Sequence, residues 1–305
     1  MRKAVPPDED NEEDRVPELP EITAHAERLT ADLSGHRLDR FEPLSFTALK
    51  TYAPPPESAH GHELRRVGAR GKHLLLDVEE VTFVVHLMQG GRLRPDTSKA
   101  KRPRNGVARW HFDGSRRLLL TEAGTERRAG VWVVEGDPLR QEPLADLGPD
   151  ADTVTAEQLA ALLTEHPMRL HTFLRDQRVL AGIGRRLANE ICHTARLSPF
   201  VGTRGMDDAQ VVALHAAIGE TIAEGLAFER GRDDMSASKD RPGRVHSRTG
   251  EVCPVCGDEV REITYNRYTV NYCATCQTGG RIMADNALSR LGVDREEWGR
   301  GRQRS

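Results

Sequence analysis

The sequence predicts an α+β protein of several domains. A leading helix and an N-terminal β-sandwich are followed by a helical domain and then by a small C-terminal β-hairpin that carries four cysteines. Three observations support this order: short aliphatic segments separated by turn residues in the first half, apolar residues at helical spacing in the second half, and two CxxC pairs near the end. At 305 residues the chain has room for two domains and a small module.

The chain begins with an acidic segment, residues 1–16, that we expect to be disordered. It holds six acidic and three basic groups and has no apolar periodicity. This excess accounts for the formal net charge of −3, so the rest of the chain is balanced, and net charge alone argues weakly against nucleic acid. Nothing at the start resembles a signal peptide, and no apolar run approaches the length of a membrane span, so we expect a cytoplasmic protein with no membrane partner.

Residues 17–146 are predicted to form the β-sandwich and its leading helix. From Ile22 to Leu33, apolar residues recur on one helix face, and Gly35 is placed to end the helix. Asp113-Gly114-Ser115 is a hairpin signal between two apolar runs. Strands are expected at residues 72–78, 81–88, 107–112, 116–121 and 130–134. Several short strands with little helix between them favour a sandwich.

A linker at residues 147–152 precedes a helical domain that is predicted at residues 153–245. Thr155 and Gln158 have the spacing of a capping box, which opens a helix. Helices are expected from this box through residue 163 and at residues 169–176, 185–195 and about 207–228. The polar stretch between Gly225 and Gly243 predicts a mobile loop.

The C-terminal module, residues 246–281, carries the clearest chemical signal. Its two CxxC pairs, sixteen residues apart, are Cys253 with Cys256 and Cys273 with Cys276. Soft thiolates in a tetrahedral array suit zinc, so the spacing predicts one structural Zn²⁺ bound by four thiolates on a β-hairpin. Two disulfides are the alternative, and they would leave Cys192 as an odd thiol. We interpret Cys192 as a buried small hydrophobic residue. Residues 282–305 form a tail to which no role is assigned.

Three shorter motifs are each weak when taken alone. Pro17-Glu18-Leu19-Pro20-Glu21 has the composition of a helix start, where the fixed φ of proline and negative charge both fit. Arg70-Gly71-Lys72-His73 lies at the entry to a strand, where a lone lysine most often faces solvent. Ala181-Gly182-Ile183-Gly184-Arg185-Arg186 leads into a helix. The backbone N–H groups of such a turn can hold a phosphate, and a plain corner between helices is the alternative.

In this order, together with His86–Arg94 and a hairpin that ends in Cys276-Gln277, these motifs resemble those of the formamidopyrimidine-DNA glycosylase / endonuclease VIII family. The resemblance covers residues 17 to about 280. It implies an N-terminal β-sandwich, a helix-two-turn-helix domain and a zinc hairpin. It also implies a monomeric, nucleoid-associated DNA repair enzyme, a bifunctional glycosylase and lyase that excises oxidised bases from duplex DNA and cuts the strand by β,δ-elimination.

The resemblance also implies roles for individual residues. The nucleophile is the secondary amine of Pro17, which attacks the sugar C1′ and forms a Schiff base. Glu18 is the acid/base that protonates the opening sugar, and Lys72 contacts a phosphate beside the lesion. DNA-binding roles fall on Glu21, which orients this cluster or caps the helix, and on Gly184, Arg185 and Arg267.

The sequence departs from the family pattern at several points, which indicates a diverged member. Pro17 is internal, and an amide nitrogen cannot form a Schiff base; translation from a GTG codon at Val16, followed by removal of the initiating Met, would expose it. Arg185 stands where the family has asparagine, and Gln89 stands where it has a methionine that fills the duplex. The nearest counterpart of the family's arginine loop is 126–129.

Two other functions stay open at this point. A chain with a blocked Pro17 would be a catalytically impaired protein that binds damaged or abasic DNA with the same fold. A zinc-ribbon transcription or translation factor would explain the cysteines but would leave the PELPE segment and the glycine turn unexplained.

Overall fold

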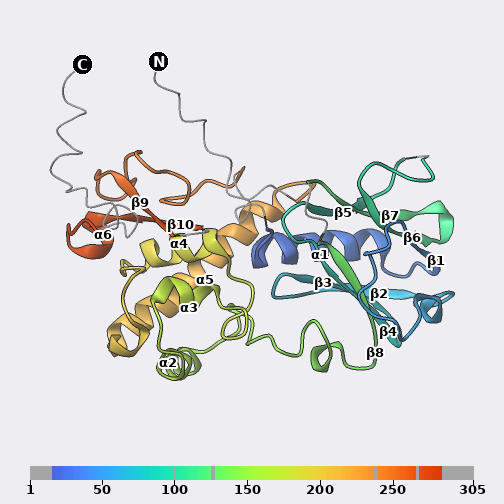
Figure 1. Cartoon of the computed structure of the whole chain (residues 1–305), viewed down its shortest axis with the longest axis horizontal. Coiled ribbons are helices and arrows are strands. Elements are labelled where there is room, and N and C mark those ends of the chain that lie inside the picture. Colours follow the sequence, from blue (N-terminus) through green and yellow to red (C-terminus); the bar gives the residue numbers. More distant parts are fainter. Residues whose placement is uncertain (1–15, 99, 125–127, 236–239, 266–267, 284–305) are drawn as a thin grey trace, which may run out of the picture. The chain divides into compact units, whose positions relative to one another are not determined.

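Figure 1 shows the computed structural model, which describes residues 16–98, 100–124, 128–235, 240–265 and 268–283. The disorder predicted for residues 1–16 therefore lies, except at Val16, outside the described residues. The described chain divides into two compact units. Unit 1 contains the chain up to Val154 with Leu174–Gly184 and Gly219–Arg241, and unit 2 contains Thr155–Phe173, Arg185–Ile218 and the chain from Pro242 onward.

In its described residues, unit 1 contains helix α1 (Leu19–Leu33) and two four-stranded antiparallel sheets. The strand orders are β1-β6-β7-β5 and β2-β3-β4-β8. The bounds are β1 Leu38–Pro43, β2 Leu64–Arg70, β3 His73–Val78, β4 Val81–His86, β5 Gly91–Pro95, β6 Gly106–Phe112, β7 Arg117–Glu122 and β8 Gly130–Glu135. The predicted helix and the five predicted strands are confirmed. Strands β1, β2 and β5 are additional, and only two residues of each are buried.

The core of unit 1 lies between the two sheets and extends to α1. Phe41 of β1 packs edge-on against Trp110 of β6 with ring centroids 5.0 Å apart, and it reaches Phe83 of the other sheet at 5.3 Å. Ile22 and Leu29 of α1 belong to the same buried cluster. Full burial of each such side chain contributes about 1.5–3 kcal/mol, so the start of α1 is fixed by a packed apolar face.

Within the described residues, four longer helices form the predicted helical region: α2 (Ala156–Glu165), α3 (Leu170–Arg175), α4 (Arg185–Thr194) and α5 (Asp208–Arg230). The capping box that opens α2 is confirmed, because Thr155 Oγ1 accepts a hydrogen bond from Gln158 N at 3.2 Å and Gln158 Oε1 accepts one from Thr155 N at 2.9 Å. Short 3-10 helices occur at Pro56–Ala59, Asp113–Ser115, Pro138–Arg140 and Thr203–Gly205.

Helix α5 corrects two expectations from the sequence. The polar loop expected from Gly225 begins later, because leucine, alanine and glutamate after Gly225 favour helix and carry α5 to Arg230. Helix α5 is also long and apolar enough to cross a membrane when only length and composition are considered, although no run of this kind was expected. A single helix of this kind is weak evidence for a membrane span, because core helices of soluble proteins pass the same test; 39% of the apolar window of α5 is buried.

The C-terminal module of unit 2 is the predicted β-hairpin. Strand β9 (Val260–Tyr265) pairs with β10 (Tyr268–Cys273) in antiparallel register, with Val260 opposite Cys273. The first CxxC pair lies in the turn before β9, and the second spans the end of β10 and the start of the short helix α6 (Ala274–Thr278). This register places both pairs at the same end of the hairpin.

Candidate functional site

The start of α1 carries the first group of predicted site residues. Pro17 and Glu18 are buried, and Leu19 N donates a hydrogen bond to Gly182 O at 3.0 Å. Glu21 Oε2 accepts a hydrogen bond from Glu18 N at 3.1 Å, so Glu21 caps the helix, one of the two roles expected for it. The chain that carries Pro17 is thereby held at a fixed helix start.

Glu21 has a buried cationic neighbour, Arg241, that was not predicted from the sequence. Arg241 Nη1 lies 3.1 Å from Glu21 Oε1, and 8% and 1% of the two side chains are exposed. Burial raises the pKa of Glu21, and the charge of Arg241 acts against this shift. The guanidinium of Arg241 occupies the space beside Gly225 and Pro20 that a Cβ on Gly225 would need. No local signal marks this pair, because its members are 220 positions apart in the sequence.

The turn at 181–184 lies directly against the start of α1. Gly182 has φ +98°, which favours glycine, and its N–H donates to Gln177 Oε1 at 3.0 Å. Gln177 Nε2 also donates to Ile183 O at 2.8 Å, so one side chain holds both sides of the turn. A Cβ on Gly184 would overlap the carboxyl group and Cγ of Glu18. Glycine at this position therefore makes room for the carboxylate of Glu18.

The turn that carries Lys72 joins the same corner. Gly71 has φ +56°, and its N–H donates to Asp150 Oδ1 at 2.7 Å, an oxygen that Arg70 Nη1 also reaches at 2.7 Å. A Cβ on Gly71 would lie 3.3 Å from the Ala181 Cβ, which places the two turns in contact. Glu18, Gly184 and the Lys72 turn are therefore brought together within unit 1.

Two histidines beside Lys72 are neutral at neutral pH. His73 and His86 lie on paired strands with ring centroids 4.6 Å apart. The pKa of His73 is lowered to about 4 and that of His86 to about 3, mainly by burial, and the charge of Lys72 contributes to both shifts. The imidazoles therefore add no positive charge next to Lys72. An anion bound at this turn would interact with the ammonium group of Lys72 rather than with a charged histidine.

The remaining predicted DNA contacts belong to unit 2 or lie outside the described residues. Arg185 opens α4 and is buried, with Nη1 3.4 Å from Thr269 Oγ1 of β10. Arg267 lies outside the described residues. The adjacent Tyr268 stacks on Tyr265 with centroids 5.1 Å apart, and it also stacks on His171 of α3 at 6.0 Å. The phosphate roles of Arg185 and Arg267 stay predictions.

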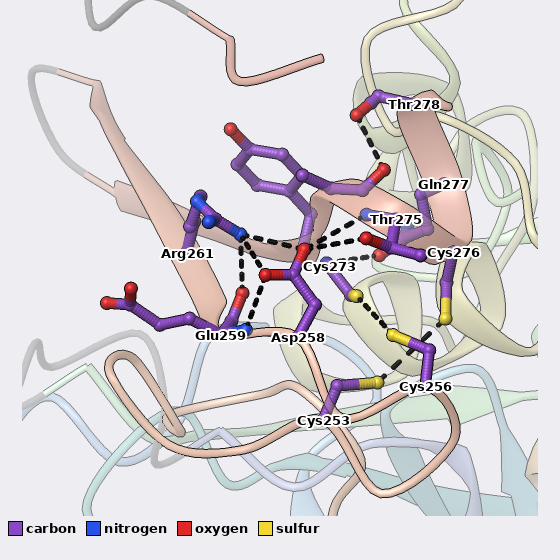
Figure 2. Close-up of polar contacts among 12 residues, drawn as sticks. Cys253, Cys256, Asp258, Glu259, Arg261, Cys273, Thr275, Cys276, Gln277 and Thr278 are labelled. Atoms are coloured by element: carbon purple, nitrogen blue, oxygen red, sulfur yellow. Dashed lines mark hydrogen bonds and ion pairs between the residues drawn. The ribbon is translucent and has the colours of Figure 1, made fainter. Parts of the chain in front are cut away.

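The four hairpin cysteines converge as Figure 2 shows. The Sγ atoms of Cys256 and Cys273 are 3.3 Å apart, and those of Cys253 and Cys276 are 3.9 Å apart. A tetrahedral Zn²⁺ with Zn–S distances of about 2.3 Å separates its sulfurs by about 3.8 Å, so this donor set fits a zinc ion. The sulfurs are too far apart for disulfides, whose S–S bond is about 2.05 Å, and all four cysteines are free.

Asp258 holds the two CxxC turns against each other, and Gln277 fixes the second turn (Figure 2). Asp258 Oδ2 accepts hydrogen bonds from Thr275 N at 3.2 Å and from Thr275 Oγ1 at 2.9 Å. The bond from Thr275 is the main reason that the pKa of Asp258 is lowered to about 2. Gln277 Oε1 accepts from Cys273 N at 2.8 Å, and its Nε2 donates to Leu197 O at 3.0 Å. These bonds would hold the sulfurs close even before a metal binds.

The buried polar residues of α4 connect this helix to the hairpin. Glu190 accepts hydrogen bonds from the backbone N–H groups of residues 244, 245 and 246, at 2.7, 3.0 and 2.8 Å. Asn189 Nδ2 donates to Asn271 Oδ1 of β10 at 3.2 Å. Glu190 and Asn189 were not identified from the sequence, although polar residues on the inner face of a helix are a signal that could have found them.

Comparisons with known proteins identify both main domains of the chain. Residues 16–132 match the family model of the formamidopyrimidine-DNA glycosylase N-terminal domain, and residues 146–236 match that of the formamidopyrimidine-DNA glycosylase H2TH domain. A protein of Mycobacterium tuberculosis named an uncharacterized formamidopyrimidine-DNA glycosylase-like protein is 43% identical over 147 residues, which are 48% of this chain and 93% of that protein. The formamidopyrimidine-DNA glycosylase of Chloroflexus aurantiacus is 29% identical over 281 residues, 86% of this chain and 98% of that protein.

Solved structures match over a similar range. The MutM (Fpg) protein of Thermus thermophilus has a TM-score of 0.72 at 28% identity, covering 86% of this chain and 99% of that chain. The Lactococcus lactis enzyme bound to DNA with an abasic site has a TM-score of 0.75 at 20% identity, covering 85% and 99%, and this likeness shows the fold alone. With both domain models matched and relatives covered over nearly their whole length, the chain belongs to the formamidopyrimidine-DNA glycosylase family.

Proposed function

We propose that this chain is a DNA glycosylase and abasic-site lyase that excises an oxidised base from duplex DNA and then cleaves the strand by β,δ-elimination. The observation that carries the proposal is the corner of unit 1, where Glu18, the turn at Gly184 and the turn at Lys72 meet. The names of the relatives support it: one solved structure is MutM with DNA containing carbocyclic 8-oxo-G, and another is the Lactococcus lactis enzyme with abasic DNA.

In the proposed reaction the secondary amine of Pro17 attacks C1′ of the damaged nucleotide and loses its proton. The bond between C1′ and the base breaks, and its electron pair leaves with the base, which takes up a proton. Glu18 gives a proton to the ring oxygen as the C1′–O4′ bond opens, which leaves an iminium between Pro17 and C1′. Loss of a C2′ proton then expels the 3′ phosphate, and loss of the C4′ proton expels the 5′ phosphate.

This chemistry requires a free amine at Pro17. A terminal amine has a pKa of about 8, so a useful fraction is neutral at physiological pH, whereas an amide nitrogen has no available lone pair. We therefore propose that the active chain starts at Pro17, through initiation at Val16 or through removal of the preceding residues. The start of the N-terminal family match at residue 16 supports this choice.

The other predicted residues bind the DNA or position the groups that react with it. Lys72 places a charge beside the lesion phosphate, Glu21 and its partner Arg241 fix the helix start, and the Gly184 turn with Arg185 and Arg267 holds the DNA backbone. Cys253, Cys256, Cys273 and Cys276 would hold one Zn²⁺, which supplies folding energy to the hairpin when bound. We also propose that the protein acts as a monomer in the cytoplasm, at the nucleoid.

Borohydride trapping tests the lyase proposal directly. Reduction of the iminium would fix the protein to an oligonucleotide that carries one abasic site, and the adduct is seen by denaturing gel and mass spectrometry. We expect an adduct from the chain that starts at Pro17. The matched control is the chain that keeps residues 1–16, which has the same fold but an amide at Pro17, and we expect no adduct from it.

A catalytically impaired binder is the second candidate, and the internal position of Pro17 favours it. It predicts that the chain starting at Pro17 binds abasic duplex more tightly than intact duplex yet gives neither adduct nor cleavage. If the chain is instead active, a panel of duplexes with single oxidised bases would identify the lesion that is excised.

A further inference from the structure

A buried histidine of α4 contacts the cluster of four cysteines without being one of the four predicted metal ligands. His193 Nε2 lies 3.3 Å from the Cys253 Sγ, and both residues belong to unit 2. Only 2% of His193 and 1% of Cys253 are exposed, so water does not reach this contact. Cys256, by contrast, is exposed and can be hydrated.

The surroundings of His193 favour one tautomer. Its Nδ1 is buried and has no hydrogen-bond partner among the described residues, whereas Nε2 faces the sulfur. A proton on Nδ1 would leave a buried N–H without an acceptor and would direct the Nε2 lone pair at the lone pairs of Cys253 Sγ. A proton on Nε2 makes the one hydrogen bond that the site offers.

We propose that His193 donates an Nε2–H hydrogen bond to the Cys253 thiolate and is thereby an outer-sphere part of the metal site. Four thiolates around one Zn²⁺ leave a net charge of −2, and a donor to a buried thiolate stabilises that charge where solvent is excluded. The bond also ties α4 to the first CxxC turn, which adds to the contact that Asn189 makes with β10.

The geometry also raises a competing arrangement, in which His193 is itself a ligand. One ligand atom from each of His193, Cys253, Cys273 and Cys276 lies within 4.8 Å of the others. Cys256 Sγ, however, lies 3.3 Å from Cys273 Sγ, so four sulfurs complete the set without the imidazole. The two arrangements place the histidine proton on different nitrogens, because a ligand that binds through Nε2 keeps its proton on Nδ1.

The test measures this proton in the full chain loaded with zinc. Long-range ¹H–¹⁵N correlation of the His193 ring is expected to show Nε2–H. A signal from Nδ1–H would overturn the proposal in favour of direct ligation. The measurement uses the unaltered chain, so it does not depend on whether a variant folds.

Variants then test what the hydrogen bond does. In the full chain with Co²⁺ as a probe, His193→Phe is expected to keep four-thiolate ligand-field bands, to shift the thiolate charge-transfer band to lower energy, and to bind Zn²⁺ about 10–100-fold more weakly in chelator competition. His193→Gln can place an amide N–H near the Nε2 position and should recover part of both effects. Cys256→Ser should remove one thiolate from the Co²⁺ spectrum. An unchanged charge-transfer band and affinity in His193→Phe, or an unchanged spectrum in Cys256→Ser, would overturn the proposal.

Discussion

At the start of α1 the backbone segments of unit 1 meet directly, whereas side chains that project from α4 hold residues 244–246 and strand β10 of unit 2. Leu19 N bonds to Gly182 O, and glycine at position 184 leaves room for Glu18. In unit 2, the carboxylate of Glu190 reaches three backbone N–H groups. The first arrangement requires that residue 184 has no side chain. The second requires the carboxylate of Glu190.

This difference decides how each region fails. Where close backbone approach depends on glycine, a substitution adds atoms and displaces the Glu18 carboxylate with a modest loss of stability. Where buried donors depend on one acceptor, a substitution removes that acceptor and leaves several groups without partners. The hairpin region should therefore be the more sensitive in stability, and the corner should be the more sensitive in chemistry.

Removal of the Glu190 carboxylate is expected to give the largest effect on stability. Glu190→Ala leaves two buried N–H groups and one partly buried N–H group unsatisfied, at about 1–3 kcal/mol for each buried group, so unfolding in urea should show a loss of at least about 2 kcal/mol. Hydrogen exchange at residues 244–246 should rise with it. Glu165→Gln on an exposed position of α2 is the matched control and should change stability by less than about 0.5 kcal/mol.

The same residue predicts a pH dependence. Burial alone would raise the pKa of Glu190, but three backbone hydrogen bonds outweigh it and hold that pKa below its usual value. A lowered folded pKa means that the stability from Glu190 is present above the unfolded value of about 4.3 and is lost as the pH falls through the folded value. The stability difference between the unaltered chain and Glu190→Gln should therefore shrink on acidification below about pH 4. A constant difference across this range would show that the charge of Glu190 does not matter.

An added methyl group at the corner of unit 1 should give a smaller loss of stability and a clear loss of chemistry. In Gly184→Ala the new Cβ overlaps Glu18, so we expect a loss of about 1–3 kcal/mol and a trapping rate at least about 10-fold lower in the chain that starts at Pro17. Gly219→Ala is the control, because open space surrounds this glycine inside α5 and alanine there should stabilise by up to about 1 kcal/mol. A normal trapping rate in Gly184→Ala would show that the reaction does not depend on the position of Glu18.

The sequence reveals an element where apolar residues keep a regular period, and it fails where that period is interrupted. Strands β3 and β4 are predicted because most of their residues are buried and aliphatic. Strands β1 and β2 are hidden, because each has an irregular register near its start that turns residues three apart, Leu38 with Phe41 and Leu64 with Val67, toward one core. Charged residues fill the positions between, so the two-residue alternation of a strand is absent.

The candidate site divides in a similar way. The cysteine spacing and the glycine turn are local patterns: the predicted hairpin is present with its four cysteines close together, and the glycine turn is present against the start of α1. Arg241 beside Glu21, Gln177 under the glycine turn and His193 beside Cys253 could not be predicted, because each acts on a residue distant in sequence or through a turn that only the fold creates. An arginine in a polar stretch of sequence gives no sign that the fold will bury it.

Lys72 at the edge of the corner should give the smallest of these effects. If its ammonium group contacts one phosphate, Lys72→Ala removes one counterion-releasing contact, and the slope of log K against log salt for duplex binding should become less steep by about 0.9. Affinity should fall by a similar factor for every duplex, damaged or intact, because a phosphate contact carries no base information. Lys101→Ala, at an exposed position before β6, is the matched control and should leave the slope unchanged. A loss confined to one lesion would instead place Lys72 against the damaged base, and equal changes in both variants would show that the slope reports general surface charge rather than this corner.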